Sequence, residues 1–247
     1  MKSTIDMGMN KTGAAMHPKQ AADMAKAAQQ ARVPPGDEGA IAAVRAEYAE
    51  SAGVVGTVPP PATAKGVLKT AAKMATGRKT TLLVDKLAER LAFERTGSRL
   101  YEAAITKIDA LGGGGEVGID RAMLERIHRE EMEHAALLAE VIEQVGADPT
   151  AETPCADVAG VQSIGLVQAI TDPRTTISQT LNTLLGAELI DNASWELVVE
   201  VAEEFGMDDA ASEFRRALRE EEEHLSTIRG WLAEATRLEA HGGEATA

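Results

Sequence analysis

The sequence contains one cysteine, Cys155, and few aromatic residues, which make up only 3% of its 247 residues. A single cysteine excludes an internal disulfide, which fits a reducing compartment. Strands draw on aromatic and β-branched residues, so a chain that lacks aromatics and abounds in alanine is predicted to be helical. Residues 1–30 lack the continuous apolar core of a signal peptide, and no window has the character of a membrane span. We therefore expect a soluble, cytoplasmic protein.

Negative charge is concentrated in the C-terminal two thirds of the chain. Residues 1–79 contain eleven Lys and Arg against six Asp and Glu, a net charge of +5, and residues 80–247 contain the remaining fourteen and thirty-three, a net charge of −19. A domain this acidic is expected to repel nucleic acid. It could instead attract metal cations.

The first 79 residues are predicted to be an extension outside the main domain. We expect a flexible or weakly helical arm to residue 35, a short helix over residues 37–51 and a linker stiffened by three consecutive prolines at 59–61. Residues 64–76 form a basic stripe, which predicts a short helix that docks on the acidic domain or on an anionic partner. The rest divides into a helical domain of residues 80–240 and a disordered tail of residues 241–247.

A six-residue motif occurs twice, as REEMEH at residues 129–134 and as REEEEH at residues 219–224. In each copy one Glu precedes a His by three residues, which places carboxylate and imidazole on one face of a helix, a turn apart. Apolar residues recur every seven positions around these pairs, as on the core-facing side of bundle helices. The residues predicted to point inward are Glu131, His134, Glu221 and His224. Their neighbours are interpreted as ordinary solvated charge: Glu130, Glu133, Glu220, Glu222 and Glu223.

A further glutamate precedes each motif on a similar apolar series. Glu94 lies thirty-seven residues before Glu131, and Glu188 lies thirty-three residues before Glu221. Both are therefore predicted to face the core as well. The chain carries an internal duplication: a helix with one inward Glu is followed by a helix with an inward Glu-x-x-His.

Turn and cap signals delimit four long helices. They are predicted at residues 80–111, 120–145, 173–205 and 208–239, the third starting at the Asp172–Pro173 dipeptide. Short loops within the first and second pairs require antiparallel neighbours, and the connection over residues 147–172, with a short helix from Asp157 to Ile170, can cross the bundle. The prediction is an all-α four-helix bundle of two antiparallel hairpins joined by a long crossover, with a partly disordered N-terminal extension.

Burying four carboxylates and two imidazoles requires compensation. An unpaired buried ion costs several kcal/mol, while a whole domain is stable by only about 5–15 kcal/mol. Two divalent cations would balance four ionised glutamates, and oxygen and nitrogen donors without thiolate suit iron or manganese. The predicted ligands are Glu94 and Glu188, one on each metal, Glu131 and Glu221, bridging both, and His134 and His224, one on each metal.

This arrangement resembles the ferritin-like superfamily of dimetal carboxylate proteins, which includes bacterioferritins, rubrerythrins and manganese catalases. The resemblance covers residues 80 to about 239 and matches six positions on four helices. It implies that Tyr101, at the position of a tyrosine that ferritins carry two turns after the first glutamate, lies beside the metals as a candidate catalytic residue. The N-terminal extension has no counterpart in classical ferritins, so cage, dimer and monomer all stay open, with a homo-oligomer as one expectation.

Other inward or aromatic residues have two interpretations. Asp191, three residues after Glu188, is either a hydrogen-bond acceptor or an additional ligand near the metals, or a partly solvated acid at the bundle edge. For Trp195 and Trp231 the two interpretations are core packing and a redox relay, and core packing is favoured.

Three classes of function follow from the resemblance. The first is binding and oxidation of Fe(II) by two iron ions with O2 or peroxide, in iron handling or oxidative-stress protection. The second is peroxide disposal by a manganese catalase or a diiron peroxidase, with two manganese ions as the alternative cofactor. The third is a scaffold in which metals hold the helices together without catalysis. The first is favoured, and whether the chain is an enzyme stays open.

Overall fold

The computed structural model describes residues 12–31, 38–53, 55–63 and 79–242. Within these ranges all regular structure is helical, so the all-α prediction is confirmed. None of the described helices combines the length and hydropathy that a membrane crossing needs.

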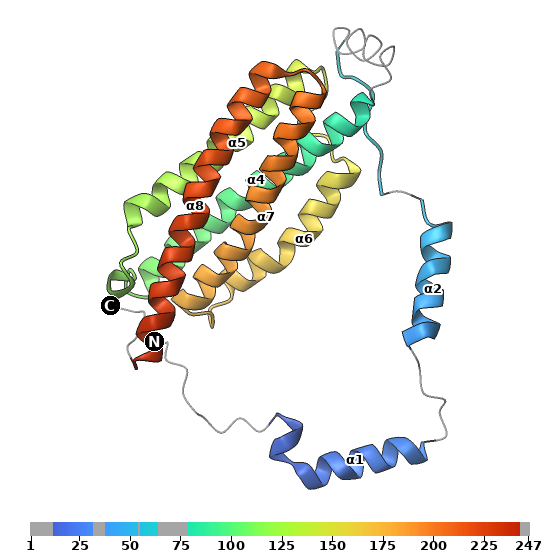
Figure 1. The fold of residues 1–247 in the computed structure, drawn as a ribbon, viewed down its shortest axis with the longest axis vertical. Coiled ribbons are helices and arrows are strands. Elements are labelled where there is room, and N and C mark those ends of the chain that lie inside the picture. The colour runs from blue at the N-terminus through green and yellow to red at the C-terminus, as the bar shows by residue number, and fades with distance from the viewer. Residues whose placement is uncertain (1–11, 32–37, 54, 64–78, 243–247) are drawn as a thin grey trace. The chain divides into compact units, whose positions relative to one another are not determined.

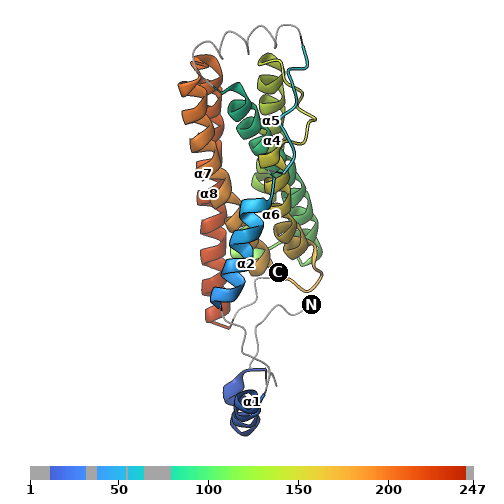
Figure 2. The same ribbon diagram turned by 90° about the vertical axis from the view of Figure 1, so that its right-hand side faces the viewer.

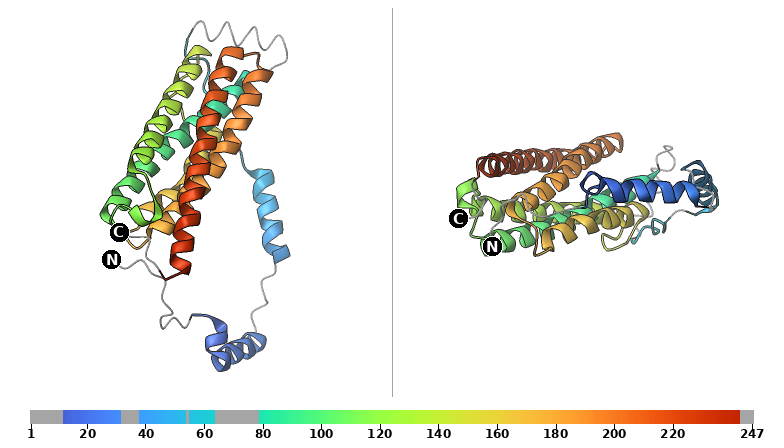
Figure 3. Two further views of the ribbon diagram at one scale, coloured as in Figure 1. Left: turned by 60° about the vertical axis from the view of Figure 1, so that its left-hand side comes forward. Right: turned by 90° about the horizontal axis from the view of Figure 1, so that it is seen from below.

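Four long helices form the bundle: α4 (Thr80–Ala110), α5 (Arg121–Gln144), α7 (Ile177–Glu204) and α8 (Asp208–Ala240). Helix α4 packs on α5 and α7 packs on α8, and α4 also contacts α7. The two hairpins lie side by side (Figures 1 and 2). Figure 3 shows α8 running the length of the bundle, and its C-terminal part contacts the short helix η2 (Gly115–Val117) in the α4–α5 connection. The prediction of two antiparallel hairpins with one crossover is confirmed.

The crossover is itself largely helical. Helix α6 (Pro154–Thr171) packs along α4 and contacts α7. It starts three residues before the helix predicted from Asp157, because the Thr153 hydroxyl caps its first turn by accepting a hydrogen bond from the Ala156 N–H at 3.4 Å. Proline at the first helical position fits this start, since its missing N–H would have no partner there.

The predicted start of the third long helix at Asp172–Pro173 is wrong. Helix α7 begins four residues later, where Thr176 and Gln179 form a capping box in which each side chain accepts a hydrogen bond from the backbone N–H of the other. The Asp172 carboxylate instead accepts hydrogen bonds from the backbone and side chain of Arg174, both at 2.9 Å. That local bonding makes the Asp-Pro dipeptide a turn.

The bundle core consists of two apolar clusters with a polar layer between them. The first cluster includes side chains from residues 83–91 of α4 and 210–217 of α8, and the second includes residues 100–108 of α4 and 228–235 of α8. The inward glutamate of α4 and the Glu-x-x-His motif of α8 fall between these stretches. The apolar clusters therefore close the polar layer off from both ends of the bundle.

The N-terminal region is described in part. It contains η1 (Ala14–Met16), α1 (Pro18–Gln30) and α2 (Glu38–Ser51), none of which buries a residue. Helix α2 matches the helix predicted for residues 37–51, and α1 lies in the predicted arm. The basic helix predicted for residues 64–76 lies outside the described residues. Residues 55–63 pack on the bundle, where the Ala62 N–H donates to the Gly146 carbonyl at 2.7 Å.

We expect Thr176→Ala to lower the free energy of unfolding by about 1 kcal/mol, because it removes the cap of α7. Thr176→Ser keeps the hydroxyl and is the matched control, expected to remain within a few tenths of a kcal/mol of the wild type. Urea unfolding of the three proteins at identical metal content measures the difference. Equal stability of the Ala and Ser variants would show that this cap does not hold the helix end.

Candidate metal centre

The six residues predicted to face inward meet in the polar layer, with contributions from all four long helices. Each side chain is at most 1% exposed, so the layer is closed to bulk water. The six are Glu94 on α4, Glu131 and His134 on α5, Glu188 on α7, and Glu221 and His224 on α8. Their convergence agrees with the register read from the seven-residue apolar series.

The potential ligand atoms form three overlapping groups, in each of which the atoms lie within 4.8 Å of one another. The groups are Glu131, Glu188, Glu221 and His224; Glu94, His134 and Glu221; and Glu94, Glu131, Asp191 and Glu221. Glu221 belongs to all three groups, and Glu94 and Glu131 each belong to two. The Glu221 carboxylate therefore lies in the middle of the cluster.

Glu94 on α4 and Glu188 on α7 each accept a hydrogen bond from an aromatic side chain of the other helix. The Tyr101 hydroxyl on α4 donates to Glu188 Oε1, and Trp195 Nε1 on α7 donates to Glu94 Oε1 at 2.8 Å. Tyr101 thus lies beside the cluster, as the resemblance implied. Trp195 is fully buried in the core, as predicted, and packs edge-on against His134 at 5.5 Å between ring centroids; its indole N–H also orients the Glu94 carboxylate.

Glu130 and Glu220 were interpreted as solvated charge, and this is wrong. His134 Nε2 lies 2.9 Å from Glu220 Oε2, and His224 Nε2 lies 2.8 Å from Glu130 Oε2. A neutral imidazole that donates its Nε2 proton to such a glutamate presents an unprotonated Nδ1 to the centre. Both rings point Nδ1 inward, at 2.7 Å and 3.2 Å from the carboxylate of Glu221. Each of these glutamates therefore positions the histidine of the opposite hairpin.

Arg90 was not singled out from the sequence, although it lies one turn before Glu94 on the same face. It is 1% exposed, and its guanidinium pairs with Glu94 Oε1 at 2.9 Å through Nε and with Asp191 Oδ1 at 2.7 Å through Nη2. Asp191 is 2% exposed, so its interpretation as a partly solvated acid is wrong. Among the described residues its carboxyl group pairs with Arg90 and is hydrogen-bonded to Glu94, rather than accepting from a histidine N–H.

Gly97 leaves room for a ligand carboxylate. A Cβ atom at this position of α4 would lie 2.0 Å from Oε2 and 2.8 Å from Cδ of Glu131, far inside van der Waals contact. Any other residue would therefore displace Glu131 or part α4 from α5. Sequence reasoning had no signal for this, because the contact joins two helices.

Burial in the polar layer shifts the pKa values of its carboxyl groups, because an ionised group without a partner is unfavourable there. Burial raises the pKa of Glu94, Glu131 and Glu188 well above the ordinary range, and it raises the pKa of Asp191 to about 7. Burial opposes ionisation of Glu221 as well, but hydrogen bonds from both histidines lower its pKa to about 2. Without a cation, Glu94, Glu131 and Glu188 therefore stay neutral by binding protons.

The pKa values of both histidines are raised, because their carboxylate partners favour the protonated imidazolium. Burial disfavours the imidazolium of His224, but its hydrogen bonds to Glu130 and Glu221 outweigh burial and raise its pKa to about 10. The pKa of His134 is also raised, where hydrogen bonds to Glu221 and Glu220 outweigh burial. Metal binding at neutral pH must therefore displace protons from both acids and imidazoles.

The donor set fits divalent cations. Among the described residues, Glu94 Oε2, both carboxylate oxygens of Glu131 and Glu188 Oε2 are buried without a hydrogen-bond partner. Buried oxygens of this kind are costly unless a cation or proton satisfies them. The free sulfur of Cys155 does not belong to any of the ligand groups, so the donors are oxygen and nitrogen. This buried carboxylate and histidine cluster can bind metal.

Comparisons with known proteins agree with this geometry. The sequence profile of the ferritin-like domain matches residues 121–238, which run from α5 to α8. Among solved structures, the chain is similar to the bacterioferritin-related protein of Bacteroides fragilis, described as a dodecameric thioferritin, with 21% identity, a TM-score of 0.50, and coverage of 70% of this chain and 98% of that one. No curated protein matches the chain. The similarity in structure confirms the predicted ferritin-like fold.

We expect Gly97→Ala to reduce bound metal, because the added methyl group occupies the space of the Glu131 carboxylate. Gly186→Ala on α7 is the matched control, since a Cβ there meets nothing within 4 Å, and alanine should stabilise that helix by up to about 1 kcal/mol. Metal content by elemental analysis and melting temperature are measured for both. Equal metal content in the two variants would contradict the tight approach of α4 to Glu131.

Protein stripped of metal by a chelator should become less stable as pH rises from 5 to 8. The raised pKa values keep Glu94, Glu131 and Glu188 protonated when folded, whereas the unfolded chain ionises them above about pH 4.3, so unfolding releases protons. His224 acts in the same direction, because its stabilisation is complete below about pH 6.5 and is lost toward its folded pKa of about 10.

Each such group contributes a slope of about 1.4 kcal/mol per pH unit within its window. Below about pH 4.3 the sign reverses, because Glu221, with a folded pKa of about 2, loses its stabilising charge. Melting temperatures across pH 3–8, with chelator and with excess Mn(II), test this. A flat profile in chelator would mean that the acids are solvated, and metal should reverse the slope because it binds the ionised ligands.

Proposed function

We propose that the chain holds two iron ions in its polar layer and oxidises Fe(II) with O2 or peroxide, which the match of the ferritin-like domain to residues 121–238 and the similar fold of a bacterioferritin-related protein support. The observation that carries this proposal is the convergence of four carboxylates and two imidazoles, each at most 1% exposed, from four helices. When bound, a pair of Fe(II) ions supplies the two electrons that reduce O2 to peroxide or peroxide to water. Iron handling or protection against oxidative stress is the expected role.

The protein supplies charge balance and rigid ligands. Four ionised glutamates carry −4 against the +4 of two divalent ions, so the loaded layer is neutral without protons. The proposed roles are terminal ligation by Glu94 and Glu188, bridging by Glu131 and Glu221, and ligation through Nδ1 by His134 and His224. All six side chains project from helices, which hold ligands more rigidly than loops do.

The groups around the ligands fix their orientation. Burial raises the pKa of Tyr101 well above its usual value, so its hydroxyl stays protonated and donates to Glu188. Tyr101 is the side chain we propose as catalytic, because it touches a ligand of the reacting metal. Glu130 and Glu220 bind the outer nitrogen of each histidine and hold the rings in place.

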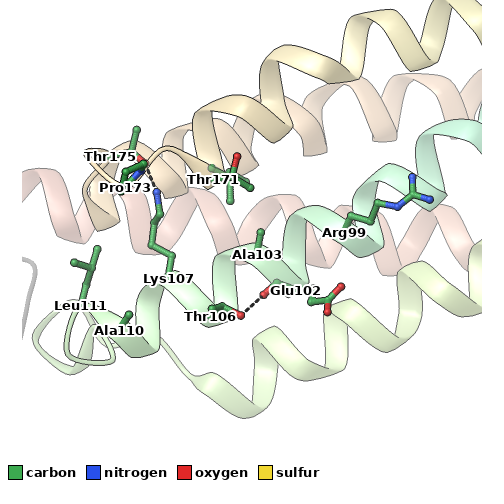
Figure 4. Close-up of a pocket in the computed structure, with 11 residues that line it drawn as sticks. Arg99, Glu102, Ala103, Thr106, Lys107, Ala110, Leu111, Thr171, Pro173 and Thr175 are labelled. Carbon is green, nitrogen blue, oxygen red and sulfur yellow. Dashed lines mark hydrogen bonds between the residues drawn. The ribbon is translucent and has the colours of Figure 1, made fainter.

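The cavities favour small reactants over a bulky organic substrate. A cavity of about 510 Å³ lies between the C-terminal half of α4 and the α6–α7 connection (Figure 4). Lys107 reaches across it to the connection, where Nζ donates to the Asp172 carbonyl at 2.5 Å and to the Thr175 hydroxyl. None of the six proposed ligands lines this cavity, so it gives an organic molecule no access to the metals.

Manganese is the alternative occupant, because oxygen and nitrogen donors suit both ions. A dimanganese centre in this layer would dispose of peroxide rather than oxidise iron. Elemental analysis of protein purified without chelator separates the two. The third class, a scaffold held by metals, predicts bound metal without oxidation of Fe(II) or consumption of peroxide.

Assembly and location stay proposals. The Bacteroides fragilis relative is described as dodecameric, and we infer that this chain also forms a homo-oligomer. The cytoplasmic location and the docking of the basic N-terminal region on the acidic bundle or a partner stay predictions.

The decisive comparison lies within one motif. We expect Glu131→Ala to lower bound metal from about two ions to one or fewer, and to reduce the initial rate of Fe(II) oxidation at least roughly 10-fold, because removing even an outer partner of a ligand costs about 10–100-fold. Glu133→Ala, two residues along the same helix on an exposed position, should keep metal and rate. Metal stoichiometry and anaerobically started oxidation assays measure both. Loss of metal from Glu133→Ala but not from Glu131→Ala would reject the proposed site.

A further inference from the structure

The duplicated helices α4 and α7 differ at two buried positions close to their inward glutamates, and the two differences are related. The inward glutamates of α4 and α7, Glu94 and Glu188, are 94 positions apart, and their aromatic partners keep the same offset. At that offset Arg90 on α4 corresponds to Leu184 on α7. One half of the layer therefore carries a guanidinium where the other carries an apolar side chain.

The second mismatch is complementary to the first. Asp191 on α7 corresponds to Gly97 on α4, so a carboxylate stands where the other half has only backbone. Arg90 and Asp191 pair with each other across the two helices at 2.7 Å, and Arg90 Nη1 also donates to the Asp191 carbonyl at 3.4 Å. The pair is thus an addition to an otherwise duplicated site.

This pair is not explained by stability. Both side chains are at most 2% exposed, and replacing a buried ion pair by apolar residues is often neutral or stabilising. The guanidinium also lies over the Phe93 ring at 4.6 Å from its centroid, so it is fixed from several sides. A costly, rigid cation beside a ligand carboxylate points to a role in the metal centre.

Arg90 changes what Glu94 can offer to a metal. Glu94 Oε1 faces Arg90 Nε at 2.9 Å and accepts from Trp195 Nε1 at 2.8 Å, which leaves Oε2 for a cation. Glu188 Oε1 accepts from the neutral Tyr101 hydroxyl. A permanent positive charge touches one terminal ligand and not the other, and it both withdraws electron density and repels a nearby cation.

The convergence of donors points the same way. Around His224 the ligand atoms of four residues come together, whereas around His134 those of three residues do. The third group brings Glu131 and Asp191 to Glu94 and Glu221, and of these four only Asp191 is not one of the six proposed ligands; it is already paired with Arg90. Glu131 and Glu221 can serve both positions, so the feature that sets the position at Glu94 and His134 apart is the ion pair beside it.

We propose that the Arg90–Asp191 pair makes the two metal positions unequal, so that the position at Glu94 and His134 binds a divalent cation more weakly than the position at Glu188 and His224. Arg90 is a positioning residue that acts through Glu94, and Asp191 limits its effect by balancing its charge. The weaker position is then the one from which metal exchanges. This inference rests on the proposed function only in requiring that two divalent ions bind.

The test is a stepwise titration of the metal-free full-length protein with Co(II) under nitrogen, followed by visible absorption. We expect the wild type to bind the first ion at least about 10-fold more tightly than the second, the scale on which outer partners of ligands change affinity. Glu94→Ala should remove the weaker step and Glu188→Ala the tighter one. These two variants assign each step to its position.

Three further variants test the ion pair. R90L/D191G installs the residues that the chain itself uses at the equivalent positions, and it should tighten the weaker step until the two differ by less than about 3-fold. Asp191→Asn leaves the guanidinium unbalanced and should weaken the same step alone, by about 10-fold. Arg95→Leu removes an exposed arginine whose guanidinium contacts the Pro149 carbonyl at 3.4 Å, and both steps should stay unchanged.

Equal steps in the wild type, or an unchanged separation in R90L/D191G, would overturn the inference. Circular dichroism of each variant shows whether it folds. If R90L/D191G does not fold, Asp191→Asn is the deciding variant. Equal weakening of both binding steps in Asp191→Asn would mean that the ion pair is only structural. A wild type that binds no Co(II) would reject the proposed metal centre itself. Two ions bound with equal affinity would reject only the inequality.

Discussion

The structure depends on keeping five carboxylates in the middle of an apolar bundle. Glu94, Glu131, Glu188, Asp191 and Glu221 are each at most 2% exposed. No such cluster can ionise without nearby positive charge, because desolvation of each ion costs several kcal/mol in a fold that is stable by only about 5–15 kcal/mol. The protein meets the constraint with two histidines, one arginine, protons on the remaining acids, and the capacity to bind cations.

The neighbouring groups make this layer rigid as well as polar. Glu94 on α4 and Glu188 on α7 are each held by an aromatic donor from the other of these two helices. His134 and His224 are each held by a glutamate of the opposite hairpin. All four contacts cross between the two hairpins, so the polar layer joins them. The apolar clusters on either side exclude water and strengthen each of these interactions.

The internal duplication explains why the two halves of the polar layer are similar, and it makes the residues that differ between them easy to identify. A repeated helical hairpin places a Glu on one helix and a Glu-x-x-His on the next in each half of the polar layer. Arg90 and Asp191 break that arrangement at the positions of Leu184 and Gly97. Position 97 on α4 must be glycine because the Glu131 carboxylate approaches the α4 backbone there. The equivalent position on α7 has no such constraint and carries Asp191.

The sequence determined which residues share a helix face, because an α-helix turns by a fixed angle per residue. The seven-residue apolar series therefore predicted all six converging side chains, while turn, cap and loop-length signals predicted the four long helices and the two hairpins. The turn and cap signals misled at two termini. Asp172–Pro173 is a turn, since the hydrogen bonds of the Asp172 carboxylate to Arg174 compete with helix initiation, and α6 starts at Pro154 because Thr153 caps it.

Only the tertiary structure decided which residues touch across helices. Glu130 and Glu220 lie one position away from an inward glutamate, yet each reaches the histidine of the facing helix, because a long side chain spans the gap between two closely packed hairpins. The burial of Arg90 against Asp191 and the approach of Gly97 to Glu131 depend likewise on the rotation and spacing of neighbouring helices. Periodicity along one helix fixes its own faces, but the distance and rotation between two helices follow from how all their side chains pack together.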